Sequence, residues 1–308
     1  MGVLYMIKRT TLIKSNSSFS ESIKSKKAFG NGYRVRRLKV SRLVLFVIMC
    51  VVALVMLVPF FWSFLTSLKT VGEVFDYPPK WIPKSIHWEN YSQVWKVVPF
   101  SRYLINSTIV SGIVTILTLL TASLAAYAFA RLKFRGRDFI FMLYLGTMMI
   151  PSQVTMIPNF ILIKLFGWTD TYAGLILPNV FTALGVFLLR QFFMTIPKEY
   201  EDAAKIDGAS RFHIYLHVIL PLSIPALSTL AVFTFVFQWN NLIWPLIVVN
   251  RESMKTLTLG LASFQGMYST NWSLLMAAAV MGIIPSFVIF VLGQKYLIKG
   301  VTLSGIKG

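Results

Sequence analysis

Histidine and cysteine, which supply many metal ligands and nucleophiles, are scarce in this chain and poorly placed for either role. His213 and His217 stand four residues apart, a spacing that would put two metal ligands on one face of a helix. The H-E-x-x-H pattern is absent, and no cysteine or carboxylate lies within easy helical reach. Cys50, the only cysteine, lies in an apolar run and has no disulfide partner in the chain. We therefore interpret the histidines as a surface pair and expect no metal site.

Sequence patterns for acyl transfer and nucleotide binding are also missing. There is no G-x-S-x-G, and no pair of carboxylates lies within an apolar stretch. Residues 300–308 match the first half of a phosphate-binding loop, but Ile306 stands where the lysine is needed and no strand precedes it. We expect neither an enzyme active site nor a bound cofactor in this chain.

The clearest pattern of polar and apolar positions lies in residues 195–221, between two apolar stretches. Pro197 suits the first turn of a helix, and the acidic residues that follow suit its positive end. These acidic residues are Glu199, Glu201 and Asp202. Tyr200, Ala203 and Ala204 fall on one face of that helix, where small side chains permit close approach by a partner.

A second short helix is predicted directly after the first. Gly208 is a natural helix terminator because it tolerates a left-handed backbone, and Ser210 can cap the next helix. An apolar stripe then follows at helical spacing, made of Phe212, Tyr215, Leu216 and Ile219. Leu220 and Pro221 lead into the next apolar stretch. The stripe requires a cover, either the chain's own apolar helices or a peripheral subunit.

The elements that must position this helix pair are suited to lipid. The chain is 56% hydrophobic and 13% charged, whereas soluble domains have about 25% charged residues. Six apolar segments are long enough to be transmembrane helices, and they are 43–68, 103–130, 139–156, 171–189, 222–248 and 274–292. Pro151 and Pro158 are expected to end the third span near Met156, with an interfacial or re-entrant piece after it. The predicted fold class is an all-α integral membrane protein.

Charge placement predicts the orientation of these spans. The net charge is +19, but the charges lie in short blocks between apolar runs, which argues against nucleic-acid binding. Residues 1–42 are basic and Ser-rich and are expected to be a disordered cytoplasmic tail before a transmembrane domain at 43–308. Because basic loops stay inside, the loop 131–137 is expected on the cytoplasmic side with both termini. We expect a multi-pass protein of the cell (inner) membrane.

Residues 202–221 closely resemble the conserved loop of permease subunits in binding-protein-dependent ABC importers. That loop has the pattern E-A-A-x3-G-x9-I-x-L-P, matched here by Asp202-Ala203-Ala204, Gly208 and Val218-Ile219-Leu220-Pro221. Asp202 for Glu and Val218 for Ile are the two departures. Further stretches resemble the carbohydrate branch of the family, most closely its maltose-type second permease, and they are 174–179, 196–199, 206–210, 238–245 and 294–308.

The resemblance implies that this chain transports a solute and that ATP is hydrolysed by a separate subunit. In that family the loop docks on a separate ATPase dimer, which binds ATP and Mg, while a second homologous permease completes the pathway. An extracellular or periplasmic solute-binding protein delivers the substrate, and the subunits alternate between inward-facing and outward-facing states. The residues that the resemblance assigns to ATPase coupling are Glu201, Asp202, Ala203, Ala204, Asp207, Gly208, Leu220 and Pro221. The C-terminal residues 300–308 are also expected near the ATPase.

Polar residues inside the apolar segments are candidates for a sugar path. Amides donate and accept hydrogen bonds and indoles stack on sugar faces, which favours Asn179, Gln238, Trp239, Asn240 and Asn241. The alternative for each is packing between helices. An importer for a non-sugar solute is the main alternative function, and the lack of Lys or Arg within the spans argues against an anionic one. A secondary transporter or a membrane enzyme would need titratable or catalytic groups that the spans lack.

Overall fold

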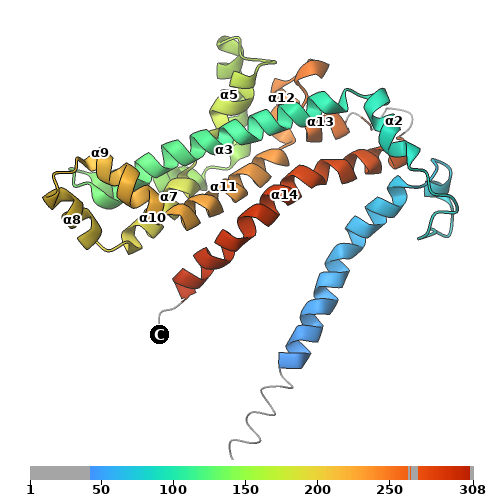
Figure 1. Ribbon diagram of the computed structural model, residues 1–308. Coiled ribbons are helices and arrows are strands. Elements are labelled where there is room, and N and C mark those ends of the chain that lie inside the picture. Colours follow the sequence, from blue (N-terminus) through green and yellow to red (C-terminus); the bar gives the residue numbers. More distant parts are fainter. Residues whose placement is uncertain (1–41, 263, 265–269, 306–308) are drawn as a thin grey trace, which may run out of the picture. The chain divides into compact units, whose positions relative to one another are not determined.

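The computed structural model describes residues 42–262, 264 and 270–305, and the regular elements of this part are helices (Figure 1). The all-α class predicted from the sequence is therefore confirmed. Apart from Arg42, the predicted basic tail lies outside the described residues. The first described helix, up to Trp62, belongs to one unit and residues 63–308 form another, so each is described by itself.

Six candidate spans are present in the described part of the chain. Three helices are each long and apolar enough to cross a bilayer, namely Arg42–Ser67, α3 (Phe100–Arg131) and α14 (Trp272–Gly305). Three pairs of shorter helices meet the same criteria only when they are joined across bends of 46°, 76° and 97°. Counting each bent pair as one span gives up to six, the number that the sequence predicts. The first member of the 76° pair, Arg211–Leu222, belongs mostly to the predicted loop 195–221, so that span is represented by Ile224–Trp239.

The third predicted span, 139–156, is one of the bent pairs. α4 (Arg137–Gly146) continues as the 3-10 turn η2 (Thr147–Met149), and α5 (Ser152–Leu165) leaves it at 97°. Pro151 stands at the break, where its ring and missing N–H prevent the helix from continuing. Pro158 lies inside α5 and does not end it. The helix therefore breaks at the first proline and not near Met156, and the predicted end of the span within the membrane stays a prediction.

The fourth span is bent and runs further than its predicted end at residue 189. α6 (Tyr172–Ile176) and the turn η3 (Leu177–Asn179) precede α7 (Ala183–Thr195), which is bent from them by 46°. α7 includes Arg190, whose guanidinium lies 4.2 Å from the centre of the Phe141 ring. The predicted span stops before Arg190 because of its charge, but the Arg190 guanidinium packs on the Phe141 ring and the helix continues past it.

The fifth and sixth spans also differ in their ends. The predicted continuous span 222–248 is two helices, α11 (Ile224–Trp239) and α12 (Ile243–Val248). The helix is interrupted at Asn240–Leu242, where amide side chains satisfy backbone groups: Asn240 Nδ2 donates to the Val236 carbonyl at 2.8 Å, and Asn241 Oδ1 accepts from the Trp244 N–H at 3.3 Å. α14 starts two residues before the predicted span and continues well beyond residue 292.

The remaining elements are short and join the spans. They are η1 (Glu73–Phe75), α2 (Glu89–Val97), α8 (Glu199–Ile206), α9 (Arg211–Ile214), η4 (Tyr215–Ile219), α10 (Leu220–Leu222), η5 (Glu252–Met254) and α13 (Leu257–Ala262). The segment between the first described helix and α3 includes Trp81, Trp88 and Trp95, which are all about half exposed or more. Such exposed indoles suit a membrane interface.

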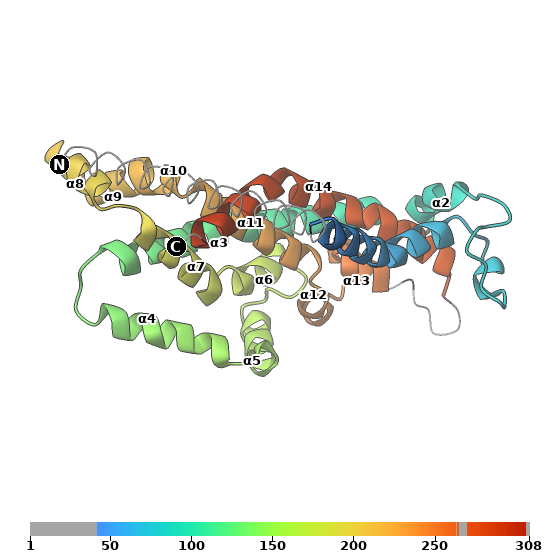
Figure 2. The same cartoon turned by 90° about the horizontal axis from the view of Figure 1, so that it is seen from below.

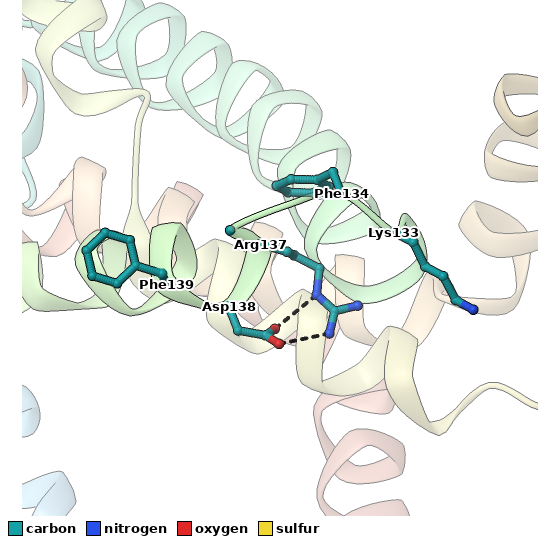
Figure 3. Close-up of a pocket in the computed structure, with 6 residues that line it drawn as sticks. Lys133, Phe134, Arg137, Asp138 and Phe139 are labelled. Atoms are coloured by element: carbon teal, nitrogen blue, oxygen red, sulfur yellow. Dashed lines mark hydrogen bonds and ion pairs between the residues drawn. The ribbon is translucent and has the colours of Figure 1, made fainter.

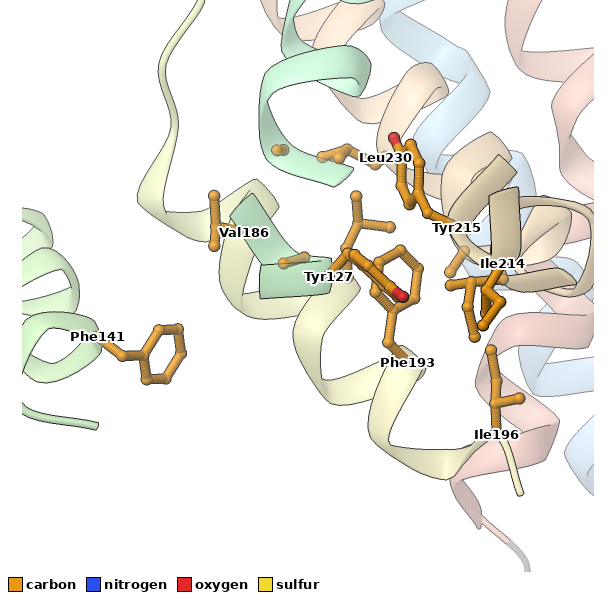
Figure 4. Packing of buried hydrophobic residues seen from close by; sticks show 13 residues of the cluster. Tyr127, Phe141, Val186, Phe193, Ile196, Ile214, Tyr215 and Leu230 are labelled. Atoms are coloured by element: carbon orange, nitrogen blue, oxygen red, sulfur yellow. The ribbon is translucent and has the colours of Figure 1, made fainter. Parts of the chain in front are cut away.

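Helix α3 is the element that connects the core of the 63–308 unit. It packs against α7 and α11, while α14 packs against α11 and α2 (Figure 1, Figure 2). Buried residues gather in three clusters along it. The cluster nearest α8 joins α3, α7, η4 and α11 through side chains that include Tyr127, Phe193 and Tyr215 (Figure 4). A second cluster joins the first half of α3 to α6 and α12, and the third joins it to α2 and α14.

Candidate functional site

The two short helices predicted in residues 195–221 are present and meet at a defined corner. α8 ends at Ile206, and Gly208 adopts a left-handed backbone with φ of +80°. The N–H of Ala209 donates to the Ala204 carbonyl at 2.9 Å, and the N–H of Gly208 donates to the Lys205 carbonyl at 3.0 Å. These two bonds form a Schellman motif, which satisfies carbonyls that a helix end would leave unpaired. The predicted role of Gly208 as terminator is confirmed.

The second helix begins as predicted and then widens. Ser210 Oγ accepts a hydrogen bond from the His213 N–H at 3.2 Å and caps α9. The helix continues as a π-helical turn, η4, before α10. His213 and His217 are exposed and stack with ring centres 4.0 Å apart. Among the described residues no cluster of His, Cys, Asp and Glu could hold a metal ion.

The apolar stripe of this second helix is only half covered. Tyr215 and Ile219 are buried in the cluster shared with α3 and α7, with 3% and 0% of their surface exposed. Phe212 is 62% exposed and Leu216 is 39% exposed. The four residues therefore form two neighbouring rows, of which one packs on the chain's own spans. The other row remains available to a partner.

Glu201, one of the residues predicted for ATPase coupling, is buried. Its side chain is only 9% exposed, and its Oε1 lies 3.0 Å from Nε of Arg131 at the end of α3. Arg131 is itself 4% exposed at its side chain and donates to the backbone carbonyls of Phe193 and Ile196. Glu201 therefore faces inward and connects α8 to α3.

The outward face of α8 carries the other predicted residues. Asp202 and Ala203 are exposed, and the Lys205 ammonium lies 2.7 Å from Oδ1 of Asp202. The hydrogen bond from Lys205 lowers the pKa of the Asp202 carboxyl below its ordinary value. Ile206 is 86% exposed and Tyr200 is 54% exposed. Apolar, small and charged side chains are thus exposed together on this face of α8.

The other predicted coupling residues frame this face. Asp207 and Gly208 are exposed at the corner, whereas Ala204 is half-buried against the cluster shared with α3. Leu220 also packs on that cluster, and Pro221 is exposed. These two residues lead to Ser223, where the chain bends by 76° into α11. The residues predicted for coupling therefore include exposed residues of this surface and residues that pack behind it.

The five residues predicted for a sugar path do not form one cluster. Trp239 is 2% exposed, stacks on Phe235, and donates from Nε1 to the Gly282 carbonyl at 3.0 Å. Its position is that of packing between α11 and α14, the alternative considered above. Asn179 lies on η3 and donates to the Leu175 carbonyl of the preceding helix, α6, at 2.9 Å.

The remaining three path residues lie where α11 ends. Gln238 is 6% exposed, and its Nε2 has no hydrogen-bond partner among the described residues. Asn240 is exposed, and Asn241 is half-buried at the break before α12. A buried amide without a partner calls for a water or a ligand, which keeps Gln238 as the best candidate of the five.

Two polar residues for which the sequence suggests no specific role, Asn106 and Asp170, hold the loop at 250–255. Asn106 donates from Nδ2 to the carbonyls of Ser253 and Lys255 at 3.0 and 2.8 Å, and its Oδ1 accepts from the Tyr172 hydroxyl at 2.7 Å. Asp170 Oδ1 accepts from the N–H groups of Asn250 and Arg251 at 2.6 and 2.7 Å. Asn106 was visible only as a polar residue in a span, because spacing says nothing of partners some 150 positions away.

Two surface cavities flank α3 at its ends. A cavity of about 460 Å³ lies beside Arg102, Asn106 and Tyr172. Another, of about 430 Å³, lies in the basic turn between α3 and α4, where Arg137 and Asp138 form an ion pair at 2.9 Å (Figure 3). Both cavities are open to the surface and are lined by polar and apolar side chains.

These observations define a class of protein: a helical membrane subunit with six candidate spans and a helix pair that presents a contact face at one end of α3. Residues 118–303 match the family described as binding-protein-dependent transport system inner membrane component. The match covers more than half of the chain, and the chain belongs to this family. It is therefore a multi-pass membrane permease component, as the sequence predicts.

Named relatives and solved structures agree with this assignment. The chain is 39% identical to an arabinooligosaccharides transport system permease protein AraQ of Halalkalibacterium halodurans, over 66% of this chain and 73% of that protein. It is 34% identical to the Bacillus subtilis protein of the same name, over 87% and 97%. It is 33% identical to the sn-glycerol-3-phosphate transport system permease protein UgpE of Yersinia pestis, over 80% and 91%.

The fold also matches a solved structure. A chain of a bacterial ABC transporter involved in the import of the acidic polysaccharide alginate superposes with a TM-score of 0.74 at 24% identity, covering 84% of this chain and 96% of that chain. This similarity concerns the fold.

Proposed function

We propose that this chain is one of two permease subunits of an ATP-driven importer for a sugar, forming half of the translocation pathway. The observation that carries the proposal is the outward face of α8, with Ile206 86% exposed beside Ala203 and the corner at Gly208. A rigid helix with small and apolar exposed side chains fits a groove on a partner. The proposed partner is a separate ATPase dimer, which binds ATP and Mg.

The helix pair then converts closure of the ATPase dimer into movement of the spans. The buried Glu201–Arg131 contact connects α8 to α3, and the Tyr215 hydroxyl connects the second helix to Ser123 of α3. A rigid element held at several points transmits a displacement that a loose loop would absorb. A second homologous permease supplies the other half of the pathway, and an extracellular or periplasmic solute-binding protein delivers the substrate.

The orientation follows from charge. The segment from the last residue of α3 to the first residue of α4 contains Arg131, Lys133, Arg135 and Arg137. It lies at the same end of α3 as α8. Placing this end in the cytoplasm satisfies the preference of basic loops for the inside. With six spans, both termini then lie in the cytoplasm, where α8 meets the ATPase.

A sugar is the substrate class we favour. Two of the relatives are named for arabinooligosaccharides, and Gln238 offers an unpaired buried amide where α11 ends. Amides bind hydroxyl groups as both donor and acceptor. The glycerol-3-phosphate name of another relative makes a phosphate ester the second candidate.

Reconstitution tests the proposal. The chain is purified with the ATPase, the second permease and the binding protein encoded with it, and the complex is placed in vesicles. We expect ATP-dependent uptake of a neutral arabinooligosaccharide, with sn-glycerol 3-phosphate as the comparison solute. Uptake of the phosphate ester alone would replace the sugar assignment. Solute movement by the chain without any ATPase would overturn the importer assignment.

A further inference from the structure

A row of three side chains on α3 contacts each part of the helix pair. Ser123, Tyr127 and Arg131 are spaced four residues apart, so they lie on one face of α3. Ser123 Oγ lies 2.7 Å from the hydroxyl of Tyr215 in η4. The Tyr127 hydroxyl donates to the Arg211 carbonyl in α9 at 3.1 Å. Arg131 contacts Glu201 in α8. We call these three residues the α3 row.

The side chains of the row are buried. Ser123 is 2% exposed and Tyr127 is 7% exposed, and the rings of Tyr127 and Tyr215 have centres 5.3 Å apart (Figure 4). Arg131 adds a second connection, because its guanidinium donates to the Ile196 carbonyl at 2.6 Å and to the Phe193 carbonyl. The end of α7 and the start of α8 are thus held by the same side chain.

The covalent connections of the helix pair to the spans are interrupted or bent. Toward α7 the chain leaves the helix at Ile196 and enters α8 at Glu199, and toward α11 it bends by 76° at Ser223. Helix α3 has no such break, because it is a single helix of 32 residues. Its first turns hold the loop at 253–257 through Asn106 and through Ser107, whose Oγ accepts from the Leu257 N–H at 2.7 Å.

We infer that the α3 row is the transmission element of the transporter, and that Arg131 is a positioning residue which passes movement of α8 to α3. The inference rests on the proposed function. A displacement of α8 moves α3 as a rigid rod, and the loop held by Asn106 and Ser107 moves with its other end. Coupling between the ATPase and the outer side of the pathway therefore depends on Arg131 and Glu201, although neither is exposed to either partner.

The experiment compares two readouts in the same vesicles. The whole complex is reconstituted with Glu201→Gln, Arg131→Lys or Tyr215→Phe, and ATP hydrolysis and solute uptake are measured together. Glu201→Gln removes the charge at constant size, Arg131→Lys removes the planar fork, and Tyr215→Phe removes one hydroxyl. Glu199→Gln on the exposed side of α8 and Arg135→Lys in the exposed turn are matched controls.

We expect the amount of assembled complex and its ATP hydrolysis to change little, while solute moved per ATP falls by about fivefold to tenfold for the Glu201 and Arg131 variants. The controls keep the wild-type ratio. A purely structural role would lower uptake and hydrolysis in proportion to the amount of complex, with an unchanged ratio. That result, or wild-type uptake in the Glu201 and Arg131 variants, overturns the inference.

A double variant separates folding from coupling. Arg131→Met with Glu201→Met leaves no lone buried charge, and replacing a buried ion pair by apolar side chains is often neutral for stability. We expect this complex to assemble and hydrolyse ATP but to remain uncoupled. Normal solute movement per ATP in the double variant would overturn the inference. If the wild-type complex itself shows no ATP-dependent uptake, the proposed function fails instead.

Discussion

Replacement of Gly208 gives the sharpest test of the corner between α8 and α9. Its backbone is left-handed with φ of +80°, and a Cβ placed there would meet no atom within 4 Å. The effect of Gly208→Ala is therefore backbone strain without a steric clash, about 1–2 kcal/mol. A single strained residue of that size leaves the membrane subunit folded.

The strain appears when the partner binds. If the free subunit relieves it by opening the corner, docking must restore the left-handed backbone. An energy of about 1–2 kcal/mol then weakens ATPase binding by about fivefold to thirtyfold. We would measure the dissociation constant of the ATPase from permease complexes in lipid nanodiscs. Asn tolerates the left-handed region, so Gly208→Asn should retain most of the affinity.

Two results would refute this reasoning. Equal affinities for the wild type and Gly208→Ala would mean that docking does not require the corner. Equal losses for Gly208→Ala and Gly208→Asn would mean that the added side chain itself blocks the groove, whatever the backbone angle. Gly72, which has φ in the ordinary region and open space around it, gives a matched control as Gly72→Ala.

Three further predictions follow from individual contacts. Trp239→Phe leaves the Gly282 carbonyl without its partner, so it should destabilise the subunit by about 1–3 kcal/mol in thermal unfolding with little change in KM, whereas a sugar platform would show a raised KM at unchanged stability. Asn106→Ala should raise hydrogen exchange at 253–257 by about tenfold, and unchanged protection there would argue against the role of Asn106 in holding the loop. The Asp202 carboxyl has a pKa lowered by Lys205, so its contribution is present above its ordinary pKa and is lost only as the pH falls below that value. The pH profile of uptake between about pH 5 and 8 should therefore keep its shape in Asp202→Asn.

The local signals in the sequence predict the helix pair well. Gly208 and Ser210 act within a few residues of themselves, so their roles as terminator and cap follow from residue type. Long-range partners do not follow from such signals. Glu201 looks like any acidic residue in a first helical turn, and its burial depends on Arg131, 70 positions earlier, which looks like any basic residue in a cytoplasmic loop.

The ends of the spans show the same limit. Hydropathy predicts that residues 222–248 cross the membrane as one span. The helix nevertheless stops at Asn240, and the amide oxygen of Asn241 accepts from the Trp244 N–H at the start of the next helix. Pro158 shows the reverse case, since a residue that usually ends a helix lies inside α5. A mean hydropathy over a segment of sequence predicts neither the break at Asn240 nor the continuation of α5 through Pro158.

The Schellman corner and the α3 row have a consequence for the kinetics of the proposed assembly. The outward face of α8 is held by contacts behind it, so in the proposed complex the ATPase would bind a preformed surface rather than a segment that must fold on it. Ordering an interface on binding costs about 0.5–1.5 kcal/mol for each immobilised side chain, and a preformed face avoids much of this. Association should then be a single step, with a rate proportional to ATPase concentration and no plateau from a slow rearrangement, and the lifetime of the complex should depend on how fast it separates.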